Sequence, residues 1–273
     1  MIIVRTIAGL REALMAPRED GSRIGLVPTM GALHEGHLSL FRASVAECDL
    51  TVASLFVNPA QFGANEDLAR YPRDEAGDAR AAEAAGVDLL FVPSGEELYP
   101  SGFQTWVEVS ELGAILEGEL RPGHFRGVAT VCLKLVNITQ PAVAYFGRKD
   151  AQQVAVIKTL LRDLNLSLEI RSMPIVRDPD GLALSSRNVY LSTDDRRRAL
   201  ALPRALEAGA AADAAGRDPV AAARAILDAT GGISVDYAEV ADLDGPTLAA
   251  AIGVGSTHLI DNVLLQSETA ETP

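Results

Sequence analysis

Two closely spaced histidines, His34 and His37, are the residues whose type and spacing most directly indicate chemistry. They lie in a turn with Gly36 between them, after an apolar run of strand length (24–27) and before apolar residues at helical spacing. Near the start of a helix, ring nitrogens and backbone N–H groups can converge on a phosphate, and a glycine lets a bulky ligand approach the backbone. Two imidazoles in that place favour transfer at a nucleotide's α-phosphate, because they can stabilise charge that builds in the transition state.

Other interpretations of the histidine pair also have to be weighed. Paired histidines can bind a metal, and a lone histidine is usually a structural or surface residue. The zinc-protease helix motif needs histidines four residues apart with Glu after the first. Here they are three apart, and Gly36 favours a loop. We therefore rank nucleotide binding above metal binding, and metal binding above a purely structural role.

Composition limits the class of protein. The chain has 273 residues, which suits two domains or one large one, with 48% hydrophobic and 22% charged residues as in ordinary globular proteins. A formal net charge of −13 argues against a nucleic-acid surface but not against a nucleotide, for which a few local cations suffice. Cys48 and Cys132 make no disulfide framework, and their apolar surroundings predict buried free thiols.

The sequence also bears on where the protein acts. No apolar run approaches the roughly 20 residues that a membrane helix needs. The first seven residues lack the basic-then-apolar pattern of a signal peptide and predict a first strand. The expectation is a cytoplasmic protein with no membrane partner.

Strands and helices alternate along most of the chain, which predicts an α/β fold with a mostly parallel sheet. The predicted strands are 24–27, 50–57, 87–92, 143–146 and 168–173, and the predicted helices are 38–48, 71–85, 128–138 and 151–164. Beyond residue 190 the composition changes. One alanine-rich helix from Ser192 to about Ala215, a second helix (219–230) and strands at 235–240 and 258–265 indicate a smaller α+β part.

Further polar turns follow the predicted strands, at the edge where open α/β sheets bind ligands. The turn at 58–63 carries Asn58 and Gln61, although Asn-Pro alone is most simply an ordinary turn. Two later turns carry residues that can bind phosphate. The first comprises Gly147, Arg148, Lys149 and Asp150, followed by Gln152 and Gln153. The second comprises Leu184, Ser185, Ser186, Arg187 and Asn188. For the loop with Arg121 and His124 two interpretations stay open, an anion-binding loop and a solvated start of a helix.

Taken together, these turns closely resemble the pantoate–β-alanine ligase (pantothenate synthetase) family. The resemblance rests on the segments 28–37, 56–63, 147–153 and 184–188 in that order, and it continues through 235–239 and 259–262. It implies that ATP and (R)-pantoate give pantoyl adenylate and pyrophosphate, and that β-alanine then displaces AMP to form pantothenate. It also implies Mg²⁺, a Rossmann-like nucleotidyltransferase domain (1–175), a smaller C-terminal lid domain (176–273) and a homodimer.

The resemblance also assigns roles to residues by position. His37 would be the proton donor, with His34, Lys149 and Arg187 as further catalytic groups. The ATP site would comprise Met30, Gly31, Ala32, Leu33, His34, Glu35, Gly36, His37, Gly147, Arg148, Lys149, Asp150, Val176, Leu184, Ser185, Ser186 and Arg187. Gln61 and Gln153 would hold pantoate, with Gln61 also near β-alanine, and Asp78 would be a magnesium ligand. Arg121 and His124 match a family loop near the cleft.

Two positions depart from the family pattern. Arg148 stands where the family usually has Glu, so any role of that acid is lost or reversed. Leu184 replaces a common Met, a volume-conserving change that we expect to be neutral.

Two other functions stay open from the sequence. One is another adenylyltransferase of the same superfamily, which would transfer AMP to a phosphate acceptor. Such an enzyme would keep the histidines, but it would bind its phosphate acceptor with positively charged side chains rather than with the amides of Gln61 and Gln153. The other is a catalytically silent nucleotide-binding regulator, which would bind ATP without pyrophosphate exchange.

Overall fold

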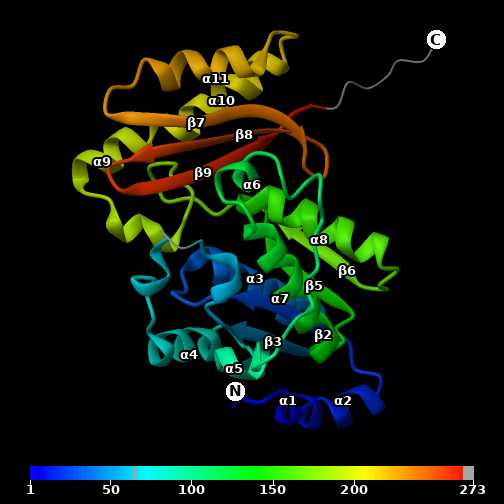
Figure 1. Ribbon diagram of the computed structural model, residues 1–273. Coiled ribbons are helices and arrows are strands. Elements are labelled where there is room, and N and C mark those ends of the chain that lie inside the picture. The colour runs from blue at the N-terminus through cyan, green and yellow to red at the C-terminus, as the bar shows by residue number, and fades with distance from the viewer. Residues whose placement is uncertain (64–65, 267–273) are drawn as a thin grey trace, which may run out of the picture. The chain divides into compact units, whose positions relative to one another are not determined.

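The computed structural model describes residues 1–63 and 66–266 (Figure 1). The chain divides into two compact units. The first comprises Met1–Arg148 with Gln152–Met173, and the second comprises Lys149–Ala151 with the chain from Pro174 onward. Among the described residues, no helix combines the length and apolar character that crossing a membrane requires.

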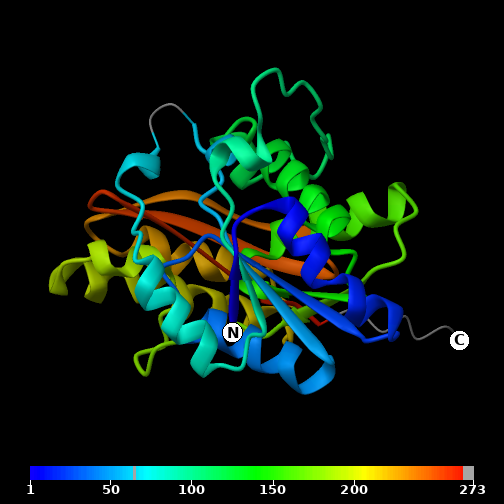
Figure 2. The same ribbon diagram turned by 90° about the horizontal axis from the view of Figure 1, so that it is seen from below.

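The first unit is built on a six-stranded sheet in the order β1-β4-β3-β2-β5-β6, with every pairing parallel. The predicted parallel sheet is therefore confirmed. The strands are β1 (Ile2–Val4), β2 (Ile24–Thr29), β3 (Leu50–Leu55), β4 (Leu89–Phe91), β5 (Val143–Gly147) and β6 (Glu169–Met173). In Figure 2 the early strands of this sheet, in blue to cyan, run side by side.

Helices and short turns connect these strands, as parallel neighbours require. The α-helices are α1 (Ile7–Ala13), α2 (Met15–Glu19), α3 (Glu35–Glu47), α4 (Glu75–Ala84), α5 (Gly95–Leu98), α6 (Glu117–Leu120), α7 (His124–Thr139) and α8 (Ala151–Asp163). The 3₁₀ turns are η1 (Pro59–Gln61), η2 (Asp67–Ala69) and η3 (Arg148–Asp150).

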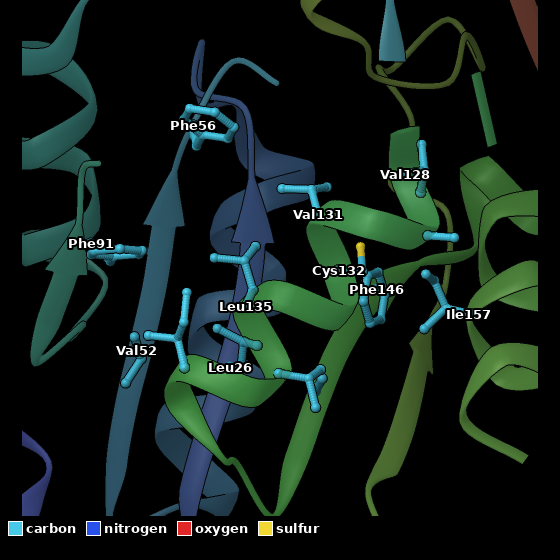
Figure 3. Close-up of a cluster of buried hydrophobic side chains, with 14 of the residues drawn as sticks. Leu26, Val52, Phe56, Phe91, Val128, Val131, Cys132, Leu135, Phe146 and Ile157 are labelled. Atoms are coloured by element: carbon cyan, nitrogen blue, oxygen red, sulfur yellow. The ribbon is translucent and has the colours of Figure 1, made fainter. Parts of the chain in front are cut away.

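Both faces of the sheet are buried, which explains the continuous apolar runs of its central strands. Successive strand side chains point to opposite faces. On β2, Leu26 joins the cluster that contains Leu135 of α7, while Val27 joins the cluster that contains Phe41 of α3. Figure 3 shows the first cluster, with Leu26 and Val52 of the sheet against Leu135. This two-sided core holds the carboxyl ends of β2, β3 and β4 in a rigid row.

The second unit pairs an antiparallel sheet, β7-β8-β9, with a layer of helices. Leu206 of one helix shares a buried cluster with Leu248 and Ile252 of the central strand. The elements are η4 (Ser186–Tyr190), α9 (Thr193–Ala199), α10 (Ala201–Asp213), α11 (Pro219–Asp228), β7 (Ile233–Asp242), β8 (Pro246–Val254) and β9 (Thr257–Leu264). The predicted smaller α+β part is confirmed.

Three predictions of secondary structure need correction. The single helix expected from Ser192 is two helices, with α9 ending at Ala199 and α10 beginning at Ala201. Pro203 explains the break, because its ring excludes the carbonyl four residues earlier, at Ala199, from a continuous helix. Strand β8 is absent from the predicted elements, since its alanine-rich run has low strand propensity.

The third correction concerns Pro28. The sequence predicts that the strand at 24–27 stops before this proline, yet β2 continues to Thr29. Pro28 lies beyond Gly25 and Leu26, the residues that pair with β5, and Thr29 N–H faces β3. The missing N–H of Pro28 therefore points to the β5 side, at a position beyond the residues of β2 that pair with β5.

The two cysteines differ in burial. Cys132 is a buried free thiol, as expected, and burial raises its pKa to about 12. Cys48 is only half-buried, which corrects the expectation for it, and its Sγ lies 3.4 Å from the Tyr145 hydroxyl.

Candidate active site

The turn between β2 and α3 places the histidine pair. Thr29 at the end of β2 is tied to the neighbouring strand, since its hydroxyl donates to Ser54 O at 2.7 Å. Gly31 and Ala32 follow with φ of 87° and 51°, both in the left-handed region. That conformation reverses the chain, so that α3 begins at the carboxyl end of the sheet.

His34 and His37 form a reciprocal cap at the start of α3. His34 is the N-cap residue, and its Nδ1 accepts from Gly36 N–H at 3.2 Å. His37 Nδ1 accepts from His34 N–H at 3.3 Å, and the two ring centroids are 4.1 Å apart. A neutral imidazole that accepts at Nδ1 carries its hydrogen at Nε2. Each neutral ring is therefore a donor at Nε2, next to the N–H groups of the helix terminus.

Asp78 of α4 lies behind this turn. Its side chain is buried, with 6% exposure, and its two oxygens accept from Ala32 N–H at 2.9 Å and Leu33 N–H at 2.8 Å. In the described part of the chain no group of three or more His, Cys, Asp or Glu side chains could hold a metal. Each Asp78 oxygen thus already has one backbone donor, and the magnesium ligand expected at Asp78 stays a prediction.

A second turn, η1, lies at the end of β3. Asn58 caps it, accepting from Ala60 N–H at 3.2 Å and donating to Gln61 Oε1 at 3.0 Å. The Gln61 amide nitrogen lies 3.2 Å from Met30 Sδ, which joins η1 to the histidine turn. Asn58 and Gln61 are 1% and 7% exposed. The sequence by itself favours an ordinary turn here, because a local Asn-Pro pattern does not show that two distant turns meet.

Helix α7 supports η1 at very short range. Asn58 Nδ2 donates to Gly127 O at 3.2 Å. A Cβ on Gly127 would lie 2.3 Å from Ala60 O, so only glycine fits this approach. The sequence gives no sign of this role, because no local pattern marks a glycine whose neighbour lies 67 positions away in the chain.

His124, the first residue of α7, and Arg121, the C-cap residue of α6, hold the same turn. His124 Nδ1–H donates to Gln61 O at 2.8 Å, and His124 Nε2 accepts from Arg121 at 3.3 Å. Burial, followed by the charge of Arg121, lowers the pKa of His124 to about 4, so the ring is neutral near pH 7. Arg121 also pairs with Glu66 at 2.5 Å. Although burial raises the pKa of Glu66, the hydrogen bond and charge of Arg121 outweigh it and lower that pKa.

A cavity of about 250 Å³ opens where these strands end. Met30 follows β2, Phe56 follows β3 and Val92 follows β4, and each lines this cavity together with Asp78. The remaining lining residues are Leu55, Val57, Pro72, Arg73, Asp74, Glu75, Pro93 and Gly95. This is the position at which open parallel sheets bind small molecules.

The later residues of the predicted nucleotide site are divided between the two units. Gly147 and Arg148 belong to the first unit, and the second unit holds Lys149, Asp150, Val176, Leu184, Ser185, Ser186 and Arg187. Asn262 Nδ2 donates to Lys149 O at 2.9 Å, and Lys149 Nζ lies 3.6 Å from Asp150 Oδ1. The loop with Ser185 and Arg187 is ordered locally. Leu184 N–H donates to Val176 O at 3.0 Å, and Ser185 Oγ accepts from Arg187 N–H at 3.3 Å.

The two glutamines after β5 differ in their roles. Gln152 is buried and donates to Leu112 O and Ile115 O, both at 2.7 Å, while its Oε1 accepts from Glu117 N–H at 3.2 Å. Those bonds satisfy its amide within the first unit. Gln153 is half-buried, and it remains the candidate for substrate contact.

Comparison with known proteins matches this architecture to a family. The family model for pantoate–β-alanine ligase matches residues 2–264. The chain belongs to the pantoate–β-alanine ligase family. Among curated relatives, the pantothenate synthetase of Acidobacterium capsulatum is 54% identical, covering 98% of this chain and 97% of its own. That of Moorella thermoacetica is 50% identical, covering 97% and 99%.

Solved structures of the pantoate–β-alanine ligase family share the fold. The pantothenate synthetase of Thermus thermophilus superposes with a TM-score of 0.92 at 45% identity, covering 96% of this chain and 99% of its own. The ligase of Francisella tularensis, crystallised with β,γ-ATP and β-alanine, gives a TM-score of 0.83 at 36% identity, covering 97% of each chain. Both the parallel sheet and the small antiparallel sheet therefore belong to the family fold.

Proposed function

We propose that the protein condenses (R)-pantoate with β-alanine to form pantothenate, using ATP and passing through a pantoyl adenylate. The observation that carries this proposal is the junction of two turns in the first unit. The reciprocally capped His34 and His37 lie on one turn, and Gln61 of the other turn contacts Met30 at 3.2 Å. A phosphate-binding helix terminus beside a buried amide suits a nucleotide and a hydroxy acid.

In the first half-reaction a carboxylate oxygen of pantoate attacks the α-phosphorus of ATP. The new P–O bond forms as the bond to pyrophosphate breaks, so negative charge grows on the departing oxygen. Neutral His34 and His37 offer Nε2–H donors, and the N-terminus of α3 adds backbone N–H groups. His37 is the residue to which the family resemblance assigns proton donation.

In the second half-reaction the neutral amine of β-alanine attacks the acyl carbon. The C–N bond forms, the C–O bond to AMP breaks, and the ammonium proton passes to a phosphate oxygen of AMP or to water. Gln61 and Gln153 are the amides assigned to orient pantoate, and the neighbouring hydrogen bond from Asn58 fixes the Gln61 carbonyl oxygen at 3.0 Å. The Gln61 NH₂ group is thereby directed as a donor.

The segments 147–150, 176 and 184–187 contribute the remaining groups of the proposal. Lys149 and Arg187 supply positive charge, and Ser185 and Ser186 supply hydroxyl donors for the phosphates of ATP. Gly147, Arg148, Asp150, Val176 and Leu184 complete the nucleotide-binding set that the resemblance assigns. Mg²⁺ would screen the negative charge of ATP, and most of its contacts would come from the phosphates, because each Asp78 oxygen already accepts a backbone hydrogen bond.

The assembly and location also follow from the family resemblance. We propose that the protein works as a homodimer in the cytoplasm, with its domains divided near residue 175. Sedimentation of the purified chain would measure its oligomeric state, and fractionation of the source cells would measure its location.

The deciding experiment is exchange of labelled pyrophosphate into ATP with β-alanine absent. We expect exchange that requires (R)-pantoate, because reversible adenylate formation needs the acyl acceptor. Exchange with a phosphate-bearing acceptor instead would favour another adenylyltransferase. ATP binding without exchange by any acceptor would favour a silent regulator and overturn the proposal.

A further inference from the structure

The carboxylate of Asp78 is placed unlike an ordinary surface acid. It projects from α4 into the turn between β2 and α3, with 6% exposure. Its Oδ2 accepts from Ala32 N–H at 2.9 Å and its Oδ1 from Leu33 N–H at 2.8 Å. Both oxygens of one buried carboxylate therefore bind adjacent backbone groups of a turn that lies 45–46 positions away in the chain.

That turn has a conformation that needs an external anchor. Gly31 and Ala32 have φ of 87° and 51°, and the left-handed region is one that alanine rarely adopts without support from its surroundings. Successive N–H groups in such turns point to one side and form a concave anion site. Asp78 occupies that concavity with a charge from within the protein.

The fit around Asp78 is tight on its other side as well. A Cβ on Gly31 would lie 2.8 Å from Asp78 Oδ2 and 2.7 Å from Leu55 Cδ1. A side chain larger than glycine at position 31 would therefore collide with the carboxylate and with the end of β3. A fixed carboxylate of this kind holds its partners in one geometry.

The residue after this turn is His34, the N-cap of α3, and His37 is one helical turn further. Any shift of the Ala32 and Leu33 backbone moves the two rings together. We propose that Asp78 is a positioning residue for the histidine pair, and that it acts through the Ala32 and Leu33 amides rather than as a magnesium ligand. This inference rests on the proposed function only for its kinetic readout.

The test compares Asp78→Asn with Asp88→Asn. Asparagine keeps the shape of Asp78 but turns an NH₂ group toward one of the two N–H donors, so at least one bond is lost. Asp88 also accepts a backbone hydrogen bond, from Thr51 N–H at 2.8 Å, and it lies before β4, at the other end of the strands. Its asparagine variant retains one acceptor and serves as the matched control.

Two readouts are measured on the full-length protein. Amide hydrogen exchange without ATP or metal should be about 10- to 100-fold faster at Ala32 and Leu33 in Asp78→Asn, and unchanged in Asp88→Asn. The kcat of pantoate-dependent pyrophosphate exchange should fall by about 10- to 100-fold, with the Mg²⁺ concentration for half-maximal rate unchanged. If Asp78→Asn does not fold, the same measurements are made on the double variant Ala32→Gly, Asp78→Asn. Glycine removes the conformational cost of the left-handed φ at position 32, so this variant tests the loss of the Asp78 hydrogen bonds alone.

Each alternative result is informative. Rescue of kcat by raised Mg²⁺ would overturn the proposal in favour of a metal ligand. Unchanged protection at Ala32 and Leu33 would overturn the anchor itself. Failure of wild-type protein to exchange pyrophosphate would instead refute the proposed function, while the amide measurement would still decide the role of Asp78.

Discussion

At the scale of single residues, the environment of each histidine decides its chemistry. His34 and His37 accept at Nδ1 and cap a helix, whereas His124 donates at Nδ1 to Gln61 O. His124 is half-buried and has a pKa of about 4, well below that of a free imidazole. The same side chain thus serves as a site donor at one place and as a neutral support at another.

The low pKa of His124 predicts a specific pH dependence of stability. Between pH 6.5 and 4 the unfolded chain binds a proton at this ring that the folded chain does not, so stability falls as pH falls through that window. At pH 4.5 the His124 ring lowers the free energy of unfolding by about 2–3 kcal/mol relative to pH 7. Urea unfolding of wild type and His124→Asn at both pH values measures it. An equal acid-induced loss in both proteins would contradict the assignment.

Lys149 gives a second prediction at this scale. Removing a well-placed charged donor typically lowers the rate by about 10²–10³. We expect Lys149→Ala to lose at least that factor in pantoate-dependent pyrophosphate exchange while its circular dichroism and Tm stay close to wild type. Lys158→Ala, which removes the same charge from α8, is the control. Near-normal exchange by Lys149→Ala would remove its role in adenylation.

At the scale of elements, the proposed site depends on how α7 meets η1. Gly127 allows backbone contact, Asn58 bonds across it, and His124 binds the carbonyl of Gln61. The helix is therefore a support for the turn that carries Gln61, in addition to covering the sheet.

Gly127→Ala tests that contact. The added Cβ would lie 2.3 Å from Ala60 O and 2.7 Å from Gln61 Cα, and neither backbone atom can move alone. We expect a loss of about 1–3 kcal/mol in unfolding free energy, as overpacking typically costs, and a raised KM for pantoate. Gly231→Ala, where an added Cβ has no neighbour within 4 Å, is the control. Unchanged KM and stability in Gly127→Ala would mean that α7 does not set the position of η1.

At the scale of the whole molecule, the chain has two compact units with separate buried clusters. Leu26 and Leu135 belong to a cluster of the first unit, and Leu206 and Leu248 belong to that of the second. Each core stabilises its own sheet. The net charge of −13 is spread over a chain whose proposed phosphate contacts need only a few local cations.

Separate cores predict separate responses to core damage. A buried Leu→Ala change costs about 2–5 kcal/mol. We expect Leu206→Ala to speed amide exchange in β7–β9 more than in β2–β5, and Leu135→Ala to do the reverse. Native-state hydrogen exchange followed by mass spectrometry separates the two. Equal acceleration across both units by either variant would mean that they unfold as one.

Sequence alone determined the fold class and the main turns of the candidate site. Buried parallel strands read as continuous apolar runs, and helix caps and glycines mark turns locally, so β2, β3, β5 and the turn around His34 and His37 were predictable. The segments that resemble the ligase family could be recognised from the sequence because each of them is a contiguous stretch of the chain.

Only the tertiary structure decided which of those turns meet. Contacts from Asp78 to Leu33 and from Gly127 to Ala60 join segments 45 and 67 positions apart, and no local pattern encodes such a distance. The alanine-rich β8 likewise depended on packing, which overrode propensity. Sequence thus supplied the reactive groups, and long-range packing decided which side chains hold them in place.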